Sequence, residues 1–522
     1  MKRISLLGAM LGVALPLAPA AAQTFSTNDP VLRAIWNEGM NNSQLYPLAQ
    51  SLLDSVGPRL TGSQELRSAS DWALARYRSW GIPARREQWG TWTDWRSGTV
   101  HVDLTAPRVR TLEAYLAPWS PGTQGAVDGD VVTLPTVSSA AEFEAWLPQA
   151  RGKWVMIAFP QPTCRPDDNW EKWAMPGSFD RMKAERQAAL LAWNSSMTAT
   201  GVTARDMPKR LEQAGALGVV TGNWNRGWGV DFNYARARTE RVPTVDLACE
   251  DYGLVYRLAQ NRQGPKLRVD ATAQVGAEAP VFNTVAEVRG SRKPNEYVMM
   301  SAHFDSWTTG SGATDNGTGT VTMMEAMRIL RKVYPKPRRT LLVGHWAGEE
   351  QGLNGSRAFV ADHPEVVAGL QALFNQDNGT GRVTNIGMQG FTGAAGYFDR
   401  WLRQIPTEIT QYIKVDSPGS PSTGGSDHSS FVCAKAPAFM LGSLSWDYGT
   451  YTWHTNRDTF DKISWDDLRN NAVLVAMLVY LASEDPDRVP RDVRTDLTDN
   501  QGHTGVWPAC QPPTRAAAQS TR

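Results

Sequence analysis

The segment NEYVMMSAHFDSWTTGSGATDNGTGTVTMMEAMRILRKVY, residues 295–334, decides the predicted fold. It opens with an apolar run that predicts a buried strand ending near His303. It closes with a periodic stretch, Val321 to Val333, that predicts a helix stopped by Pro335. A glycine-rich loop carrying Asp305 and Asp315 joins the two elements. The loop therefore sits at the carboxyl end of a strand, where binding residues gather in α/β sheets.

The same order of elements recurs further along the chain. The apolar runs RRTLLVGHWAGEE (338–350) and LQALFNQDN (370–378) also end in acidic residues. The stretch SWDDLRNNAVLVAMLVYLASE (464–484) predicts a long closing helix. Strands that alternate with helices predict an α/β fold, a mixed sheet with a parallel centre flanked by helices.

The rest of the chain divides by composition. Residues 23–107 are helical in pattern at first and form the N-terminal part of this domain. Residues 108–280 form an inserted, β-rich domain with the short runs GKWVMIAF, GALGVVTG and RVPTVDLA. Residues 281–485 are expected to form the domain of alternating strands and helices. Residues 486–522, rich in Pro, Asp, Arg and Thr, are expected to be an extended or poorly ordered extension.

The first 22 residues, MKRISLLGAMLGVALPLAPAAA, predict a signal peptide. Two cations precede a short apolar run and the small residues Ala20 to Ala22. A buried N-terminal helix is the alternative. The run is too short to span a membrane, so the mature protein is expected to be exported, to the periplasm or fully secreted. Without Lys2 and Arg3 the net charge changes from +1 to −1, which gives no reason to expect nucleic acid or an anionic membrane as a partner.

Cysteine chemistry is expected to be structural. An exported chain can keep disulfides, and the four cysteines allow three pairings that sequence does not distinguish. None has the C-x-x-C spacing of a thiolate metal site. The cysteines are Cys164, Cys249, Cys433 and Cys510.

Five candidate metal ligands lie at strand ends or in the following loops. Nitrogen and oxygen donors in this mixture suit Zn²⁺, with Mn²⁺ or Co²⁺ as substitutes. One structural zinc needs four ligands, so five are better explained by two metals that share a carboxylate. The five are His303, Asp315, Glu350, Asp377 and His454.

Two further acidic residues have predicted roles beside the metals. Asp305 follows His303 by two residues and can accept the other imidazole N–H, which fixes the tautomer. Glu349 and Glu350 are adjacent, so their side chains point differently: one can bind metal while the other acts as general base. Each motif alone has an ordinary structural interpretation, since a Glu-Glu pair is usually a solvated surface. The glycine-rich turn also lacks the lysine of a phosphate-binding loop.

The ordered set HFDSW…GATDNGTG, GHWAGEEQGLNGS, FNQDNG and HTNRDT resembles the motifs of M28 family zinc exopeptidases. Within that family the carboxypeptidase Q group is most similar. GPRLTGS (57–63) is similar to the family's opening segment, and residues 108–280 resemble the protease-associated (PA) domain often inserted in these enzymes.

The resemblance implies a role for each residue. Asp315 would bridge two zinc ions, Glu350 and His454 would complete one site, and His303 and Asp377 the other. Glu349 would be the general base and Asp305 would support His303. It also implies a cis peptide bond between Asp315 and Asn316.

One position departs from the family pattern. Some relatives have an oxyanion-stabilising tyrosine directly before the last histidine, where this chain has Trp453. The substitutes considered are Tyr448, Tyr451 and His428.

The predicted function is hydrolysis of terminal peptide bonds of short peptides, by an aminopeptidase or dipeptidase. Recognition of the amino or the carboxyl end stays open. The alternatives are a glutaminyl-cyclase-like or deacylase enzyme on the same scaffold, and a non-catalytic receptor-like protein.

Overall fold

The computed structural model describes residues 25–233, 236–498 and 504–519. Its larger lobe is built on a mixed sheet. Parallel pairs join β9 (Lys293–His303) to β10 (Arg339–Trp346) and to β11 (Leu370–Asn375), and β11 to β14 (Ala438–Ser443). Antiparallel strands β8 (Lys266–Val288) and β12 (Val383–Gly387) flank this centre, and β13 (Lys414–Asp416) forms the edge beyond β12. The predicted fold class is therefore confirmed.

Two buried helices support this sheet. Helix α9 (Thr318–Val333) packs beside α15 (Trp465–Glu484), and α1 (Pro30–Asn41) covers both. Almost every residue of α15 after Leu468 is buried, which explains its continuously apolar sequence. The remaining helices of this lobe are α2 (Leu45–Gln50), α3 (Gln64–Ser79), α10 (Asn354–Asp362), α11 (Pro364–Gly369), α12 (Ala395–Leu402), α13 (Thr407–Thr410) and α14 (His428–Val432).

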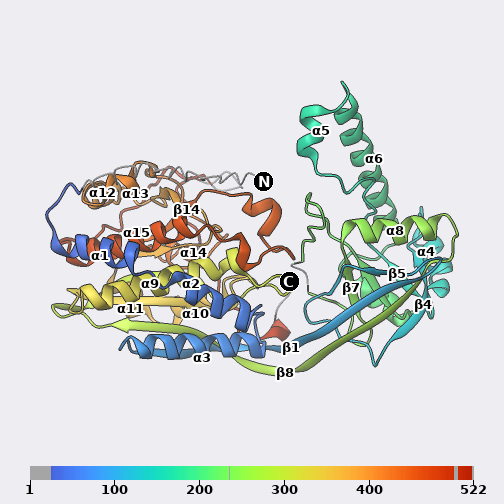
Figure 1. The fold of residues 1–522 in the computed structure, drawn as a ribbon, viewed down its shortest axis with the longest axis horizontal. Helices are drawn as coiled ribbons and strands as arrows, with labels where there is room; N and C mark the ends of the chain where they lie inside the picture. Colours follow the sequence, from blue (N-terminus) through green and yellow to red (C-terminus); the bar gives the residue numbers. More distant parts are fainter. Residues whose placement is uncertain (1–24, 234–235, 499–503, 520–522) are drawn as a thin grey trace, which may run out of the picture.

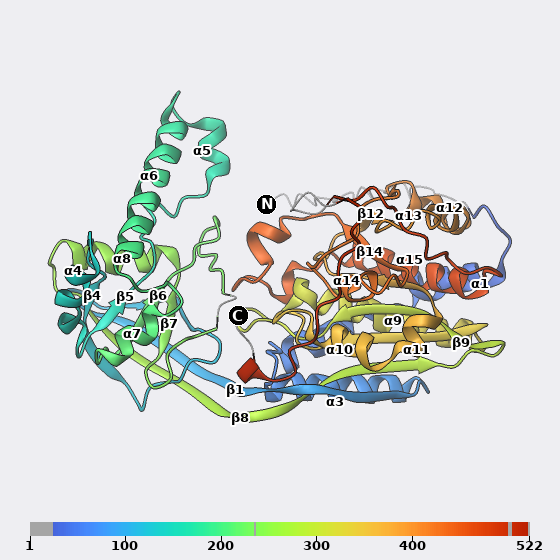
Figure 2. The ribbon, with the colours of Figure 1, turned by 180° about the vertical axis from the view of Figure 1, so that it is seen from behind.

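Two unusually long strands connect the larger lobe to the inserted one. β1 (Ala84–Ala106) and β8 pair antiparallel from Ala84–Ala286 to Ala106–Lys266. Figures 1 and 2 show this pair running from beneath the larger lobe into the inserted lobe. The expected boundary at residues 280–281 thus falls inside a continuous strand.

In the inserted lobe the sheet continues from β8 into β4 (Val127–Thr133), which pairs with it antiparallel. Strands β5 (Trp154–Met156), β6 (Gly218–Thr221) and β7 (Thr244–Leu247) follow β4 in parallel and lie in the three predicted runs. Short strands β2 (Arg110–Leu112) and β3 (Ala114–Leu116) pair with β1 and β7. Val155 of β5 joins a separate core with Phe143 and Leu211, whereas Trp154 faces the main core. This alternation is the period of a strand that is buried on both faces.

Helices fill more of the inserted lobe than the predicted strand-rich pattern indicated. They are α4 (Ala140–Trp146), α5 (Asp167–Trp173), α6 (Ser178–Ala199), α7 (Met207–Gln213) and α8 (Cys249–Gln260). Figure 1 shows α5 and α6 projecting from the lobe as an arm. Few residues of α6 are buried, so its sequence lacks the apolar periodicity that predicts a helix.

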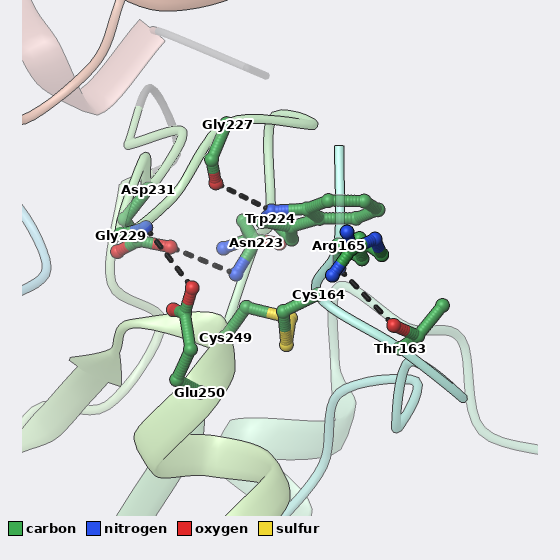
Figure 3. The surroundings of a disulfide bond; sticks show 10 residues. All are labelled: Thr163, Cys164, Arg165, Asn223, Trp224, Gly227, Gly229, Asp231, Cys249 and Glu250. Atoms are coloured by element: carbon green, nitrogen blue, oxygen red, sulfur yellow. Dashed lines mark hydrogen bonds between the residues drawn. A yellow bond between two sulfur atoms is a disulfide. The ribbon is translucent and has the colours of Figure 1, made fainter. Parts of the chain in front are cut away.

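The chain forms two disulfides, which correspond to one of the three possible pairings of its four cysteines. Cys164–Cys249 ties the segment before α5 to the first residue of α8 (Figure 3), and Cys433–Cys510 anchors the C-terminal tail. Side chains of the tail also contact the larger lobe: Trp507 donates to the Val432 carbonyl, and Arg515 donates to the Trp89 carbonyl, both at 2.9 Å.

The predicted signal peptide, residues 1–22, lies outside the described residues. Among the residues that are described, no helix combines the length and apolar character needed to cross a bilayer.

Candidate metal centre

The five predicted ligands converge at the carboxyl edge of the parallel strands. His303 ends β9, Asp315 lies in the turn Ala313–Gly317 before α9, and Asp377 follows β11. Glu350 follows β10, and His454 comes from the loop after Tyr448–Thr452. Because strands β9, β10 and β11 are parallel, their ends meet at one edge. Four separate segments of the chain thus place their donors together.

Asp315 lies at the middle of the cluster. Its Oδ1 is 3.0 Å from His303 Nε2, and its Oδ2 is 3.1 Å from His454 Nε2. His303 Nε2 is also 3.2 Å from Asp377 Oδ1, and His454 Nε2 is 2.9 Å from Glu350 Oε2. The cluster therefore has two halves, each with one imidazole and one carboxylate of its own, joined by the two oxygens of Asp315.

The donor set fits metal ions. The atoms of each half lie within 4.8 Å of one another, and no ion is present. Ligands bonded at roughly 2.0–2.1 Å to a tetrahedral zinc are about 3.3 Å apart, close to the separations observed. Glu350 Oε1 is buried and has no hydrogen-bond partner among the described residues. An oxygen in that state is costly unless a cation or a polar group reaches it.

The pKa shifts within the cluster also favour the binding of cations. Burial raises the pKa of Glu350 to about 7 despite the opposing effect of His454. Burial raises the pKa of Glu349 as well, and the charges of Asp377, Glu350 and Asp427 add to it. Burial lowers the pKa of His454, but Glu350 and Asp315 raise it to about 10. Buried carboxylates crowded in this way are stabilised by any positive charge among them.

The hydrogen bonds of Asp305 differ from the predicted ones. His303 Nδ1 lies 3.0 Å from the main-chain carbonyl of Asp305, whereas the Asp305 carboxylate is 3.8 Å away. That carboxylate instead accepts the backbone N–H groups of Glu349 and Glu350, at 3.2 and 3.3 Å, and the Thr61 hydroxyl at 2.9 Å. A carboxylate can take several donors at once. Asp305 thus orients His303 through its backbone and holds the Glu349–Glu350 turn through its side chain.

Asp458 is a supporting residue that sequence reasoning missed. Its carboxylate accepts the backbone N–H groups of Thr314 and Asp315, at 2.6 and 3.0 Å, and the Thr314 hydroxyl at 2.8 Å. It fixes the turn in which the Asp315–Asn316 peptide bond is cis, as predicted. Asp458 is visible in the motif HTNRDT, but only the fold shows which backbone groups it meets.

Trp307 is a second missed residue. Its Nε1 donates to Glu350 Oε2 at 2.7 Å, and its ring lies 6.0 Å from that of His454. It stands in the quoted loop at HFDSW. An indole there orients one predicted ligand, Glu350, and packs against another, His454.

The oxyanion candidates are not equivalent in position. Trp453 stacks on the His454 ring, with the ring centroids 4.1 Å apart, so its indole lies over the face of the imidazole. Tyr448 begins the turn Tyr448–Thr452, whose Thr452 hydroxyl accepts from the Thr314 hydroxyl, next to Asp315, at 2.9 Å. Burial raises the pKa of Tyr448, and the charges of Asp315 and Asp377 add to the shift. Tyr451 packs near Gly227 of the inserted lobe instead. His428 is buried, and burial lowers its pKa to about 4, so it is neutral.

The inserted lobe contacts the segment that carries His454. The Asn233 N–H donates to the His454 carbonyl at 2.8 Å, and the Asp231 N–H donates to Asn456 Oδ1 at 2.8 Å. The Phe232 ring stacks on the His454 ring at 5.7 Å. These contacts were not predicted, because nothing in the sequence pairs residues 231–233 with 454–456.

Comparison with known proteins finds a family match within the larger lobe. Residues 283–479 match the family described as Peptidase family M28. The chain carries a peptidase family M28 domain. This domain contains all five predicted ligands and Glu349.

The similarity to known proteins extends beyond this domain and covers most of the chain. Carboxypeptidase Q of Mus musculus is 24% identical over 460 residues, which is 88% of this chain and 89% of that protein. A Peptidase M28 precursor from Shewanella amazonensis has a TM-score of 0.63 and 21% identity over 89% of this chain and 98% of its own. A zinc aminopeptidase from Bacillus subtilis has a TM-score of 0.55 and 18% identity over 86% and 96%. The predicted family and the predicted enzyme class, a metallo-exopeptidase, are confirmed.

Proposed function

We propose that this protein is an exported, dinuclear zinc exopeptidase that hydrolyses terminal peptide bonds of short peptides. One observation supports the proposal that two zinc ions bind. The two oxygens of Asp315 face the Nε2 atoms of two different histidines, at 3.0 and 3.1 Å. A carboxylate in that position can bridge two ions spaced roughly 3.5–4 Å apart.

The proposed ligand sets follow the two halves of the cluster. His303 and Asp377 would hold one zinc ion, Glu350 and His454 would hold the other, and Asp315 would be shared by both sites. Mn²⁺ or Co²⁺ would suit the same nitrogen and oxygen donors. Bound zinc would supply Lewis-acid polarisation of the scissile carbonyl and would favour deprotonation of water.

The chain's own residues move the proton. Glu349 shares a cluster with His303 and Glu350, so its carboxylate can take a proton from the attacking water and later give it to the leaving amine. Asp305 fixes the backbone of Glu349 and thereby the direction of its side chain. Tyr448 is the residue we assign to stabilise the oxyanion, because its turn contacts Thr314, next to Asp315, and burial keeps its hydroxyl protonated.

Two organisational proposals accompany the activity. Residues 1–22 are proposed to be a signal peptide that directs export, to the periplasm or outside the cell. Residues 108–280 are proposed to be a PA-like inserted domain, with the boundary on the β8 side inside a shared strand.

The test couples metal content to turnover. The mature protein is purified, its metal is counted by elemental analysis, and it is assayed against dipeptides and against N- or C-blocked analogues, with and without chelator. About two zinc ions per chain and chelator-sensitive cleavage are expected. Asp315→Asn should lose zinc and activity together, whereas the exposed Asp416→Asn should change neither. About one metal per chain without peptide cleavage would instead favour a cyclase-like enzyme.

A further inference from the structure

A cavity of about 950 Å³ opens between the metal centre and the inserted lobe. Trp307, Glu350 and Gln351 line it on the side of the metal centre, and residues of the inserted lobe line the rest. Typical small-ligand sites enclose roughly 300–1,000 Å³. The cavity is thus near the upper end of that range, larger than the side chain of a single terminal residue requires.

Three arginines of the inserted lobe line this cavity: Arg205, Arg236 and Arg238. The Arg236 guanidinium lies 5.4 Å from the Trp119 ring and donates to Thr93 Oγ1 at 3.4 Å. Arg238 makes no hydrogen bond or ion pair with any residue in the described ranges 25–233, 236–498 and 504–519. Burial lowers the pKa of Arg238, Arg205 and Arg236 lower it further, and Asp206 opposes them. The arginines are therefore close together, with less negative charge than positive charge nearby.

Two indole rings connect Arg236 to the metal centre. Arg236 lies over the Trp119 ring, Trp119 is 6.2 Å from Trp307, and Trp307 is 6.0 Å from His454. An extended peptide advances roughly 3.3 Å per residue. A group bound at the arginines therefore belongs to a residue several positions away from a bond cleaved at the metal centre.

The wall between the two ends presents unpaired amide groups. Buried polar atoms of Gln161, Asn233 and Gln351 have no hydrogen-bond partner among the described residues. Asn233 is 2% exposed and joins the backbone that contacts His454. Buried amides without partners are costly, and the N–H and C=O groups of an extended peptide would satisfy them. Aromatic side chains, among them Trp119 and Trp224, supply the apolar surface.

We propose that this cavity binds the carboxyl-terminal part of an oligopeptide whose carboxylate is held by Arg236 and Arg238. The substrate's amino-terminal peptide bond then lies at the metal centre. Guanidinium groups bind carboxylates through charge-assisted hydrogen bonds and repel a free amine, so the cavity selects the direction of the peptide. The enzyme is therefore an amino-end exopeptidase that favours peptides of about three to five residues. This inference rests on the proposed function.

The experiment compares each peptide acid with its C-terminal amide. The substrates are Leu-Ala and Leu-Ala-Ala-Ala, each as acid and amide, together with Leu-Ala-Ala-Glu-amide. For the zinc-loaded wild-type protein, kcat/KM is expected to be about tenfold or more higher for the tetrapeptide acid than for its amide, through KM. The two dipeptides should differ little, because they do not reach the arginines. If Leu-Ala-Ala-Glu-amide behaves like the acid, a side-chain carboxylate serves as well as a terminal one.

Variants test the named residues. Arg238→Gln and the double variant Arg236→Gln/Arg238→Gln should bring the acid-to-amide ratio close to one, chiefly by raising KM for the acid. Arg238→Lys should keep part of the preference. Arg241→Gln is the matched control, because this exposed arginine is not part of the cavity wall, and it should keep the wild-type ratio.

Three results would overturn the inference. The first is equal turnover of acid and amide by the wild type, and the second is an unchanged ratio in the double variant. The third is release of the carboxyl-terminal alanine before leucine. If the zinc-loaded protein cleaves none of these peptides, the proposed function fails instead. In that case calorimetric binding of tri-alanine and its amide to the wild type and Arg238→Gln decides whether the cavity holds a carboxylate.

Discussion

At the scale of single residues, the adjacent carboxylates Glu349 and Glu350 have different surroundings. Glu350 faces His454 Nε2 at 2.9 Å and receives the indole N–H of Trp307. Among the described residues, no hydrogen-bond donor reaches the Glu349 carboxylate, which is grouped with His303 and Glu350. Adjacency alone left open which glutamate binds metal, and the family resemblance assigned Glu350 to that role. The different neighbours of the two side chains support this assignment.

Glu349→Gln tests this separation. The amide keeps the shape of the side chain but cannot take a proton from water, so kcat/KM should fall by at least about 100-fold. Zinc content should stay at the wild-type value, because Glu349 is not among the proposed ligands. Elemental analysis and steady-state kinetics on one preparation measure both. Glu365→Gln, at an exposed position, is the control and should change neither; near-full turnover by Glu349→Gln would remove it as the base.

A second residue-scale feature is a pair of buried aspartates, Asp231 in the loop that contacts the His454 segment and Asp246 in β7. Asn223 donates its backbone N–H to Asp231 at 3.1 Å and its side-chain amide to Asp246 at 3.3 Å (Figure 3 shows Asn223 and Asp231). Burial raises the pKa of Asp246 to about 7. Burial and the charge of Asp246 also raise the pKa of Asp231. The pair therefore holds a proton at pH values where an ordinary aspartate does not.

This pair predicts how stability depends on pH. An unfolded aspartate has a pKa of about 3.9, so between about pH 4 and pH 7 the folded protein binds more protons than the unfolded chain. The free energy of unfolding must then fall as pH rises through that window. Asp246→Asn should remove this loss and raise the free energy of unfolding at pH 8 by about 1–3 kcal/mol. Thermal unfolding at pH 5 and pH 8 measures it.

The matched control is Asp128→Asn, at an exposed ion pair with Arg268. It should change stability by less than about 0.5 kcal/mol at either pH. Equal pH dependence in wild type and Asp246→Asn would show that the pair does not hold the proton.

At the scale of elements, the contacts made by the segment GPRLTGS explain why it contains Arg59, Thr61 and Ser63. Arg59 is fully buried and donates to the carbonyls of Phe304, Ser311 and Gly312, at 2.8, 2.8 and 2.9 Å. Thr61 donates to Asp305, and Ser63 caps α3 by accepting the Leu66 N–H at 3.1 Å. Seven residues thus hold the loop between β9 and α9 and begin the next helix.

Arg59→Lys tests whether this segment positions the metal ligands. A single ammonium group cannot reach several carbonyls as a guanidinium fork does, so buried acceptors lose their donors. We expect a loss of about 2–4 kcal/mol in unfolding free energy and about tenfold weaker zinc binding. Chelator competition and denaturant unfolding measure the two effects. Arg76→Lys, exposed on α3, should be neutral; wild-type zinc affinity in Arg59→Lys would limit Arg59 to a purely structural role.

A structural feature could be predicted from the sequence where neighbouring residues determine it. The strand ends and the candidate ligands His303 and Asp377 follow from apolar runs with polar ends, and Asp315 follows from the glycine-rich turn before a helix; these are local signals. Helix α6 was missed because most of its faces are exposed. The roles of Arg59 and Asp458 were missed because their partners lie 245–253 and 143–144 residues away along the chain. Such pairings exist only once the sheet has formed.

At the scale of the whole molecule, the two lobes meet twice. The long pair β1 and β8 joins them along one side. Across the cavity, the loop of residues 223–233 contacts the segment that carries His454. Since this loop also carries wall residues of the cavity, the position of the inserted lobe controls both a proposed metal ligand and the proposed peptide site.

Asn456 is the residue on which this second contact depends most. Its Oδ1 accepts the Asp231 N–H at 2.8 Å, and its Nδ2 donates to the Gly229 carbonyl at 2.9 Å. The same nitrogen lies 3.1 Å from both Glu113 Oε1 and the Tyr115 hydroxyl. All four partners belong to the inserted lobe, whereas Asn456 is two residues from His454.

Asn456→Ala should therefore loosen the lobe contact while the five proposed ligands stay in place. Losing these hydrogen bonds removes about 1–3 kcal/mol of local stability, so amide hydrogen exchange in residues 223–233 should become about tenfold faster. KM for a tetrapeptide should rise more than KM for a dipeptide, because only the longer substrate needs the cavity. Asn261→Ala, exposed at the end of α8, should match the wild type in both measurements. Unchanged exchange in Asn456→Ala would mean that β1 and β8 alone fix the lobe, and the cavity would then be a rigid feature of the fold.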